Sequence, residues 1–274
     1  MEKSMKRIDI WSVFMYLILY SIAGFFIETI FGLVTKGVIE SRKSFIYGPF
    51  CAIYGIGAVC MIFFLRKEKF IWKLFFKGSL IGALVEYLMS LFFEKFFCVK
   101  WWDYSNLFFN IEGRTCLFYA ISWGLLAIFL IKYVNPSTDR FIDYLRENGS
   151  LFKKVTAFIV LFFCFDALLS GYALKIFYYR IATQKDINIT NKVYAQKKYD
   201  EIQEDTKFIG FVNNYFDNEK MIKTYPNIMI EDENKNIVYV DSLFNDYKVY
   251  YYRLGNFGNG LEKWKKSKKA LDIY

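Results

Sequence analysis

The chain has 274 residues, of which 55% are hydrophobic and 22% aromatic, and a formal net charge of +9. This composition is too apolar for an ordinary soluble domain and excludes an intrinsically disordered chain, so we expect a protein of the lipid bilayer. The sequence contains no histidine. It therefore lacks the side chain that most often acts as a general base near neutral pH or binds zinc and copper.

Five apolar segments are long enough to cross a bilayer, which takes about 20 helical residues. They cover residues 10–34, 46–65, 72–93, 115–134 and 155–177. We therefore predict an all-α polytopic membrane bundle over residues 1–180, with these five segments as transmembrane helices. The first segment is too long for a signal peptide and has no small-residue cleavage site after it, so we expect it to be retained.

Acidic residues interrupt some of these segments at regular spacing. In the first segment, Glu28 lies between Gly24 and Gly32, four residues from each. The three residues therefore share one helix face, on which the glycines allow close approach of another helix. Between the first two segments, the glycines and the proline of residues 44–57 interrupt the entry to the second helix. Such an interruption is either a plain turn or irregular backbone covered by protein or water.

The third segment carries the longest series of this kind. Gly78, Gly82, Glu86, Ser90 and Glu94 follow one another at four-residue intervals, so they lie along one side of a helix. An ionisable side chain at membrane depth costs about 3 kcal/mol and marks a pathway, a relay or a tight partner contact. Glu94 lies near the membrane end beside Lys95, and we expect it in a surface ion pair.

The fifth segment repeats the pattern with Asp166 and Ser170. The acids and serines of these faces, together with Tyr54 of the second segment, form one candidate site, which comprises Glu28, Glu86, Asp166, Ser90, Ser170 and Tyr54. We interpret it as a polar intramembrane site at which the acids converge to handle a cation, a proton or a cationic group. The alternative is that the acids only fix helix packing, through hydrogen bonds to aromatic side chains or loop arginines.

The loop between the third and fourth segments combines aromatic and charged residues. With the preceding helix end, its candidate site residues are Glu94, Trp101, Trp102, Asp103, Tyr104 and Arg114. Tryptophan and tyrosine collect at membrane interfaces without any special function. An ion pair between Asp103 and Arg114 would close the loop over the helix ends, whereas the functional alternative is a substrate lid.

The basic residues are distributed unevenly over the loops. Lys and Arg in the N-terminal segment and the second and fourth loops outnumber those in the first and third loops by about two to one. Because positive charges stay on the cytoplasmic side, we predict a multi-pass protein of the cell membrane with a cytoplasmic N-terminus and an extracytoplasmic C-terminal domain. Anionic lipid is a sufficient partner for these charges, and nucleic acid is not expected.

After residue 180 the composition becomes polar, and we predict a small α+β extramembrane domain over residues 181–274. Residues 185–207 are typical of a helix or loop. Residues 227–231, 236–240 and 247–254 alternate in the manner of short strands, which indicates a small β meander. Neither a phosphate-binding loop nor a hydrolase or metalloprotease motif occurs, so no enzyme class and no cofactor is supported.

Several short motifs follow one another in a characteristic order. They are G-F-F-I-E at 24–28, Y-G-P-F-C-A-I-Y-G-I-G at 47–57, E-K-F-F at 94–97, W-W-D-Y-S at 101–105 and G-R-T-C-L at 113–117. In this order they resemble the bacterial membrane protein family called Putative ABC-transporter type IV (CmpB-like), most strongly over residues 8–136. The resemblance implies a permease that works with a separate ATPase subunit.

We therefore expect a permease-type subunit whose carboxylates line a polar site, in a homo-oligomer because five spans are few for a complete pathway. An intramembrane enzyme acting on a lipid or lipid-linked substrate is one alternative, with Glu94 or Asp103 as general base beside Arg114. A non-catalytic sensor or assembly subunit is the other. Transport predicts that the intramembrane acids face one hydrated cavity, whereas the sensor predicts paired, dry acids and a recognition surface in the C-terminal domain.

Overall fold

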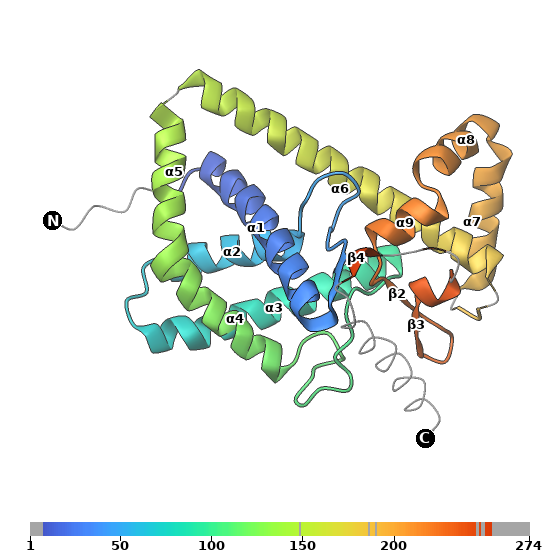
Figure 1. Cartoon of the computed structure of the whole chain (residues 1–274), viewed down its shortest axis with the longest axis horizontal. Coiled ribbons are helices and arrows are strands. Elements are labelled where there is room, and N and C mark those ends of the chain that lie inside the picture. The colour runs from blue at the N-terminus through green and yellow to red at the C-terminus, as the bar shows by residue number, and fades with distance from the viewer. Residues whose placement is uncertain are drawn as a thin grey trace. The chain divides into compact units, whose positions relative to one another are not determined.

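The computed structural model describes residues 8–147, 149–185, 187–189, 191–244, 247 and 250–253, and most of them are helical (Figure 1). The α-helices are α1 (Ile10–Lys36), α2 (Ala52–Leu65), α3 (Ile71–Phe97), α4 (Leu117–Phe129), α5 (Asn135–Glu147), α6 (Ser150–Gln184), α7 (Lys192–Glu204), α8 (Thr206–Tyr215) and α9 (Asn218–Thr224). A π-helical turn, η1 (Leu130–Val134), joins α4 to α5. The strands are β1 (Val38–Glu40), β2 (Met229–Glu231), β3 (Ile237–Tyr239) and β4 (Tyr250–Arg253), and a 3-10 turn, η2 (Val240–Leu243), follows β3.

The chain divides into two compact units. Unit 1 consists of the described residues of Met1–Gly24, Phe45–Phe96 and Trp102–Ser170. Unit 2 consists of the described residues of Phe25–Ser44, Phe97–Trp101 and Gly171–Tyr274. Helices α1, α3 and α6 therefore contribute residues to both units. The predicted domain boundary at residue 180 stays a prediction.

Within the described residues, four helical stretches are long and apolar enough to cross a membrane. They are Ile10–Lys36, Ile71–Phe97, Leu117–Glu147 and Ser150–Gln184. Large apolar side chains remain exposed along all four, for example Phe26, Leu80, Leu125 and Leu168. Exposed apolar surface of this extent is what a lipid-facing helix requires.

The predicted second span, residues 46–65, is helical only from Ala52. Helix α2 has 14 residues, so it is about 21 Å long and falls short of the roughly 30 Å of hydrocarbon. The irregular part contains Pro49, which has no N–H to donate and disfavours a helical conformation in the residue before it. Five full-length spanning helices are therefore not confirmed, because hydropathy counts apolar residues without detecting where a helix starts.

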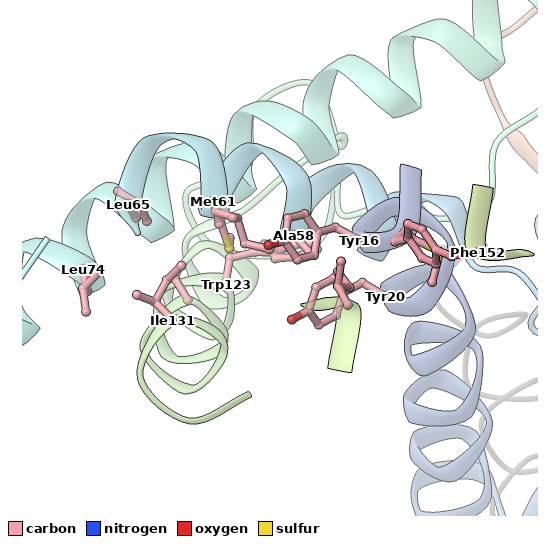
Figure 2. Close-up of a cluster of buried hydrophobic side chains, with 13 residues drawn as sticks. Tyr16, Tyr20, Ala58, Met61, Leu65, Leu74, Trp123, Ile131 and Phe152 are labelled. Carbon is pink, nitrogen blue, oxygen red and sulfur yellow. The ribbon is translucent and has the colours of Figure 1, made fainter. Parts of the chain in front are cut away.

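The core of unit 1 is a cluster of apolar side chains from helices α1 to α6 and the η1 turn (Figure 2). Tyr16 of α1 and Met61 of α2 lie in it beside Trp123 of α4. Helix α3 approaches α4 through small residues: a Cβ atom on Gly82 would overlap the Trp123 ring, so only glycine allows this contact. The first half of the four-residue series on α3 thus packs against α4.

The described residues of unit 2 form two short antiparallel sheets. Strands β2 and β3 pair with Met229 opposite Tyr239, and Asp232 closes their turn by accepting hydrogen bonds from the backbone N–H of Asn234 and Asn236. Strand β4 pairs with β1 and not with β3. The predicted three-stranded meander is therefore wrong: its third strand completes a sheet with β1, a three-residue strand too short to stand out in the sequence.

Candidate functional site

Glu86 of α3 is buried, with 4% of its surface exposed. Its Oε1 accepts a hydrogen bond from Tyr104 Oη at 3.1 Å, and its Oε2 accepts one from Thr115 Oγ1 at 2.8 Å. Tyr104 lies in the loop between α3 and α4, and Thr115 lies just before α4. The carboxylate therefore ties this loop to the side of α3.

Arg114 makes a second connection two turns further along the same face. Its Nη2 donates to Glu94 Oε1 at 3.0 Å, and its Nη1 forms an ion pair with Glu94 Oε2 at 2.7 Å. Nη1 also lies 3.4 Å from Ser90 Oγ, to which it donates. Since Glu86, Ser90 and Glu94 are spaced by four residues, all three meet the loop from one face of α3.

This network bears on two expectations. Glu94 forms an ion pair with the buried Arg114 and keeps about a fifth of its side-chain surface exposed, and its place near the membrane surface stays a prediction. The predicted Asp103–Arg114 ion pair is wrong, because Asp103 Oδ1 accepts hydrogen bonds from the backbone N–H and the hydroxyl of Ser105 instead. An aspartate side chain readily accepts hydrogen bonds from backbone N–H groups close to it in sequence. The Arg114 guanidinium therefore pairs with other acids.

The charges of the loop reinforce one another. Hydrogen bonding to Glu94 raises the pKa of Arg114, so this guanidinium stays charged. Glu112 accepts hydrogen bonds from Tyr87 Oη at 2.9 Å and from Arg114 Nε at 3.2 Å. The bond from Tyr87, followed by that from Arg114, lowers the pKa of Glu112 below its usual value.

Aromatic side chains complete the loop. The ring of Tyr104 stacks on that of Tyr119 of α4, with centroids 4.4 Å apart, and on that of Trp102 at 6.4 Å. Trp102 Nε1 donates to the backbone oxygen of Arg114 at 2.8 Å. Gly113 has a φ of +66°, and a Cβ atom there would overlap the side chains of the Asp103 turn, so this position requires glycine. These contacts hold the side chains of the loop in place against one another and against α4.

Asp166 of α6 is fully buried and has a different environment. Its Oδ1 accepts from the backbone N–H of Tyr47 at 3.1 Å, and its Oδ2 accepts from that of Gly48 at 2.7 Å. Ser170 donates to Oδ1 at 3.3 Å and accepts from the N–H of Ile46 at 2.8 Å. Irregular backbone at membrane depth needs such partners, and here protein side chains provide them.

The remaining predicted residues are placed as follows. Tyr54 of α2 packs on Gly24 and lies 5.5 Å from the Trp123 ring, between centroids. Glu28 is partly exposed on α1 and belongs to unit 2, as does Trp101, whose ring meets Tyr225 edge-on at 6.1 Å. The structure therefore brings together Glu86, Ser90, Glu94, Trp102, Tyr104 and Arg114.

The hydrogen bonds of Glu86 and of Asp166 go to different residues, and the convergence of the three intramembrane acids stays a prediction. Three further residues contact predicted ones but were not predicted from the sequence: Thr115, Glu112 and Tyr119. Only Thr115 had a signal, since it directly follows Arg114 at the start of the fourth predicted span. Among the described residues, no three His, Cys, Asp or Glu side chains are grouped so that they could hold a metal ion.

The four long apolar helices, with polar contacts buried between them, define a polytopic helical membrane protein. The chain belongs to the family described as Putative ABC-transporter type IV, whose model matches residues 15–171. This confirms the resemblance seen in the short motifs, and the matched range includes Glu86, Arg114 and Asp166. No curated protein and no solved structure matches the chain.

Proposed function

We propose that the protein is a permease-type subunit of an ABC transporter and that Glu86 forms part of a polar site on its substrate path. The observation that carries this proposal is the burial of the Glu86 carboxylate on the apolar helix α3. A charged group at membrane depth costs about 3 kcal/mol and marks a pathway, a relay or a specific partner. Membership of the transporter family favours a pathway.

The hydrogen-bond donors to Glu86 are of a kind that a bound substrate can replace. Both donors described above are hydroxyls, from Tyr104 and Thr115. A hydroxyl can rotate away and use its lone pairs instead, so a substrate cation or ammonium group can take its place on the carboxylate. We assign to Glu86 the binding of a cation, a proton or a cationic group, with Ser90 and Tyr54 along the same path.

We assign to the loop at residues 102–116 the role of a cover over this site. The Arg114–Glu94 ion pair and the Tyr104–Glu86 hydrogen bond both end on α3. Opening the cover requires these contacts to break, and substrate binding at Glu86 would weaken one of them. This links occupancy of the site to the position of the loop.

The proposed transporter needs further components. The sequence has no phosphate-binding loop, so ATP hydrolysis falls to a separate ATPase subunit. We also propose a homo-oligomer in the cell membrane, with basic loops facing anionic lipid, a cytoplasmic N-terminus and an extracytoplasmic C-terminal domain. Glu28, Asp166 and Ser170 are the remaining proposed members of the polar site.

The proposal can be tested with the complex purified from native membranes and reconstituted into liposomes. We expect a nucleotide-binding subunit to co-purify in a fixed ratio, and Glu86→Gln to lower ATP hydrolysis by the complex at least tenfold. Glu147→Gln, which changes an exposed carboxylate at the end of α5, should leave hydrolysis unchanged. Absence of an ATPase subunit, or equal hydrolysis by two equally stable variants, would overturn the proposal.

A membrane-anchored sensor is the second candidate, and two observations favour it. Asp166 is dry, with both carboxylate oxygens bonded to backbone N–H groups. Unit 2 contains a polar cavity in its C-terminal part. The Glu86→Gln variant separates the two candidates. If the protein is a transporter, the variant should lose transport. Ligand binding by unit 2, on which the sensor depends, should stay intact.

A further inference from the structure

Unit 2 contains a cavity of about 480 Å³, a volume typical of sites for small molecules. It is bordered by the end of α6 and by α7, α8 and the start of α9. Its polar lining includes Arg180, Gln184, Gln203, Asn213, Asp217 and Glu219. The other lining residues are Asn218 and two tyrosines, Tyr199 and Tyr247, so the cavity has no aliphatic lining and suits a polar ligand.

Arg180 is the unusual member of the lining. Only 4% of its surface is exposed, and its Nη1 donates to the backbone oxygen of Phe216 at 2.9 Å and to Asn218 Oδ1 at 3.0 Å. Its Nε and Nη2 are buried and have no hydrogen-bond partner in the part of the chain that the structure describes. Buried polar groups are nearly always paired, so two unpaired nitrogens on one guanidinium indicate a missing acceptor.

The geometry of these nitrogens specifies the acceptor. Nε and one terminal nitrogen form the planar fork with which arginine binds carboxylates and phosphates at two points. The acids of the cavity do not supply it. Asp217 Oδ1 caps α9 by accepting from the N–H of Lys220, and Glu219 pairs with Lys223. No described acid forms an ion pair with Arg180.

We infer that this cavity binds a small polar molecule that carries one carboxylate or phosphate group, which the Nε and Nη2 of Arg180 hold. The amides of Gln184, Gln203 and Asn213 contact the uncharged polar part of the ligand. This site is separate from Glu86, and the inference does not depend on whether the membrane part transports a substrate.

The test is a calorimetric titration of the full-length protein in nanodiscs of uncharged lipid, with inorganic phosphate and with lactate, and with glycerol as the uncharged comparison. We expect saturable binding of at least one of the two anions and none of glycerol. The anion that binds identifies the group as phosphate or carboxylate. Absence of saturable binding of both anions, or equal binding of glycerol, would overturn the inference.

Two matched variants on α7 test the position of the anion while leaving Arg180 and its structural contacts in place. Gln203→Glu adds a negative charge to the exposed rim of the cavity and should weaken anion binding at least tenfold. Gln196→Glu makes the same change on α7 outside the cavity and should leave binding unchanged. Equal effects of the two variants would place the anion elsewhere. Arg180→Lys keeps the charge but loses the fork, so it should also bind at least tenfold more weakly.

Discussion

Glu86 and Asp166 are two buried acids of unit 1, and each is followed by a serine four residues later on its helix. Their partners differ in kind. Glu86 accepts hydrogen bonds from two side-chain hydroxyls of the loop between α3 and α4, whereas Asp166 accepts from two successive backbone N–H groups. Backbone donors have no other way to be satisfied at membrane depth, whereas hydroxyls have. Similar sequence patterns therefore place one acid on backbone donors and the other on side-chain hydroxyls, and only the second environment suits the exchangeable site proposed for Glu86.

The largest expected effect is that of Asp166→Ala. It leaves the N–H groups of Tyr47 and Gly48 buried without an acceptor, at about 1–3 kcal/mol each, so we expect the free energy of unfolding to fall by roughly 3–5 kcal/mol. Reversible unfolding in detergent, followed by tryptophan fluorescence, measures this. Glu147→Ala, at an exposed position, should cost less than about 0.5 kcal/mol. A similar loss for both variants would contradict the anchoring role.

The Arg114–Glu94 pair should come next. Removing the guanidinium with Arg114→Gln leaves Glu94 without its main counter-charge, and we expect a loss of roughly 2–4 kcal/mol. A double-mutant cycle with Glu94→Gln should give a coupling energy of about 1–3 kcal/mol. The same cycle with Glu112→Gln should give a smaller coupling energy, because the Glu112 carboxylate is exposed to solvent. Equal coupling in the two cycles would show that burial does not distinguish these pairs.

Glu86→Gln should lower the free energy of unfolding less than Asp166→Ala does, which separates the two buried acids further. Glutamine keeps an oxygen that can accept from Thr115, and the Tyr104 hydroxyl can turn to another acceptor, so we expect a loss of about 1 kcal/mol. The same unfolding measurement gives this value. A loss as large as that of Asp166→Ala would mean that both acids are anchors, and the proposed site at Glu86 would lose its main support.

The smallest effect concerns pH. Because the pKa of Glu112 is lowered in the folded protein by its bonds from Tyr87 and Arg114, the stabilising contribution of this carboxylate is fully present above its unfolded pKa. It is lost as the pH falls through the lowered folded value. Hydrogen exchange of the loop should therefore accelerate below about pH 4.5. Glu112→Gln should remove this part of the pH dependence, and an unchanged profile in the variant would assign it to another acid.

Periodicity in the sequence was sufficient to predict part of this arrangement. Glu86, Ser90 and Glu94 share a face because four residues make slightly more than one helical turn, and this does not depend on the rest of the fold. The face that they meet could not be predicted. Thr115 and Tyr104 reach Glu86 from residues 29 and 18 positions away, and no local pattern encodes such a contact.

The same limit explains the misassigned elements. Hydropathy treats residues 46–51 and 52–65 alike because both are apolar. The backbone N–H groups of the first part, however, donate to Asp166, Ser170 and Ser21 and do not form helical hydrogen bonds. Likewise β4 alternates like a hairpin strand, but it pairs with β1, about 210 residues earlier. Local sequence predicts whether a segment can form a strand or helix, while the choice of partner depends on the whole fold.

The irregular stretch at residues 46–51 has a mechanical consequence. Its N–H groups are bonded to two helices, to α6 through Asp166 and Ser170 and to α1 through the backbone oxygen of Ser21. A helix bonded only to itself can slide past its neighbours without losing hydrogen bonds, but this stretch cannot. Any displacement of α6 against α1 must either break these bonds or pull the beginning of α2 along. The stretch thus acts as a short tether, through which movement of one membrane helix is transmitted to another.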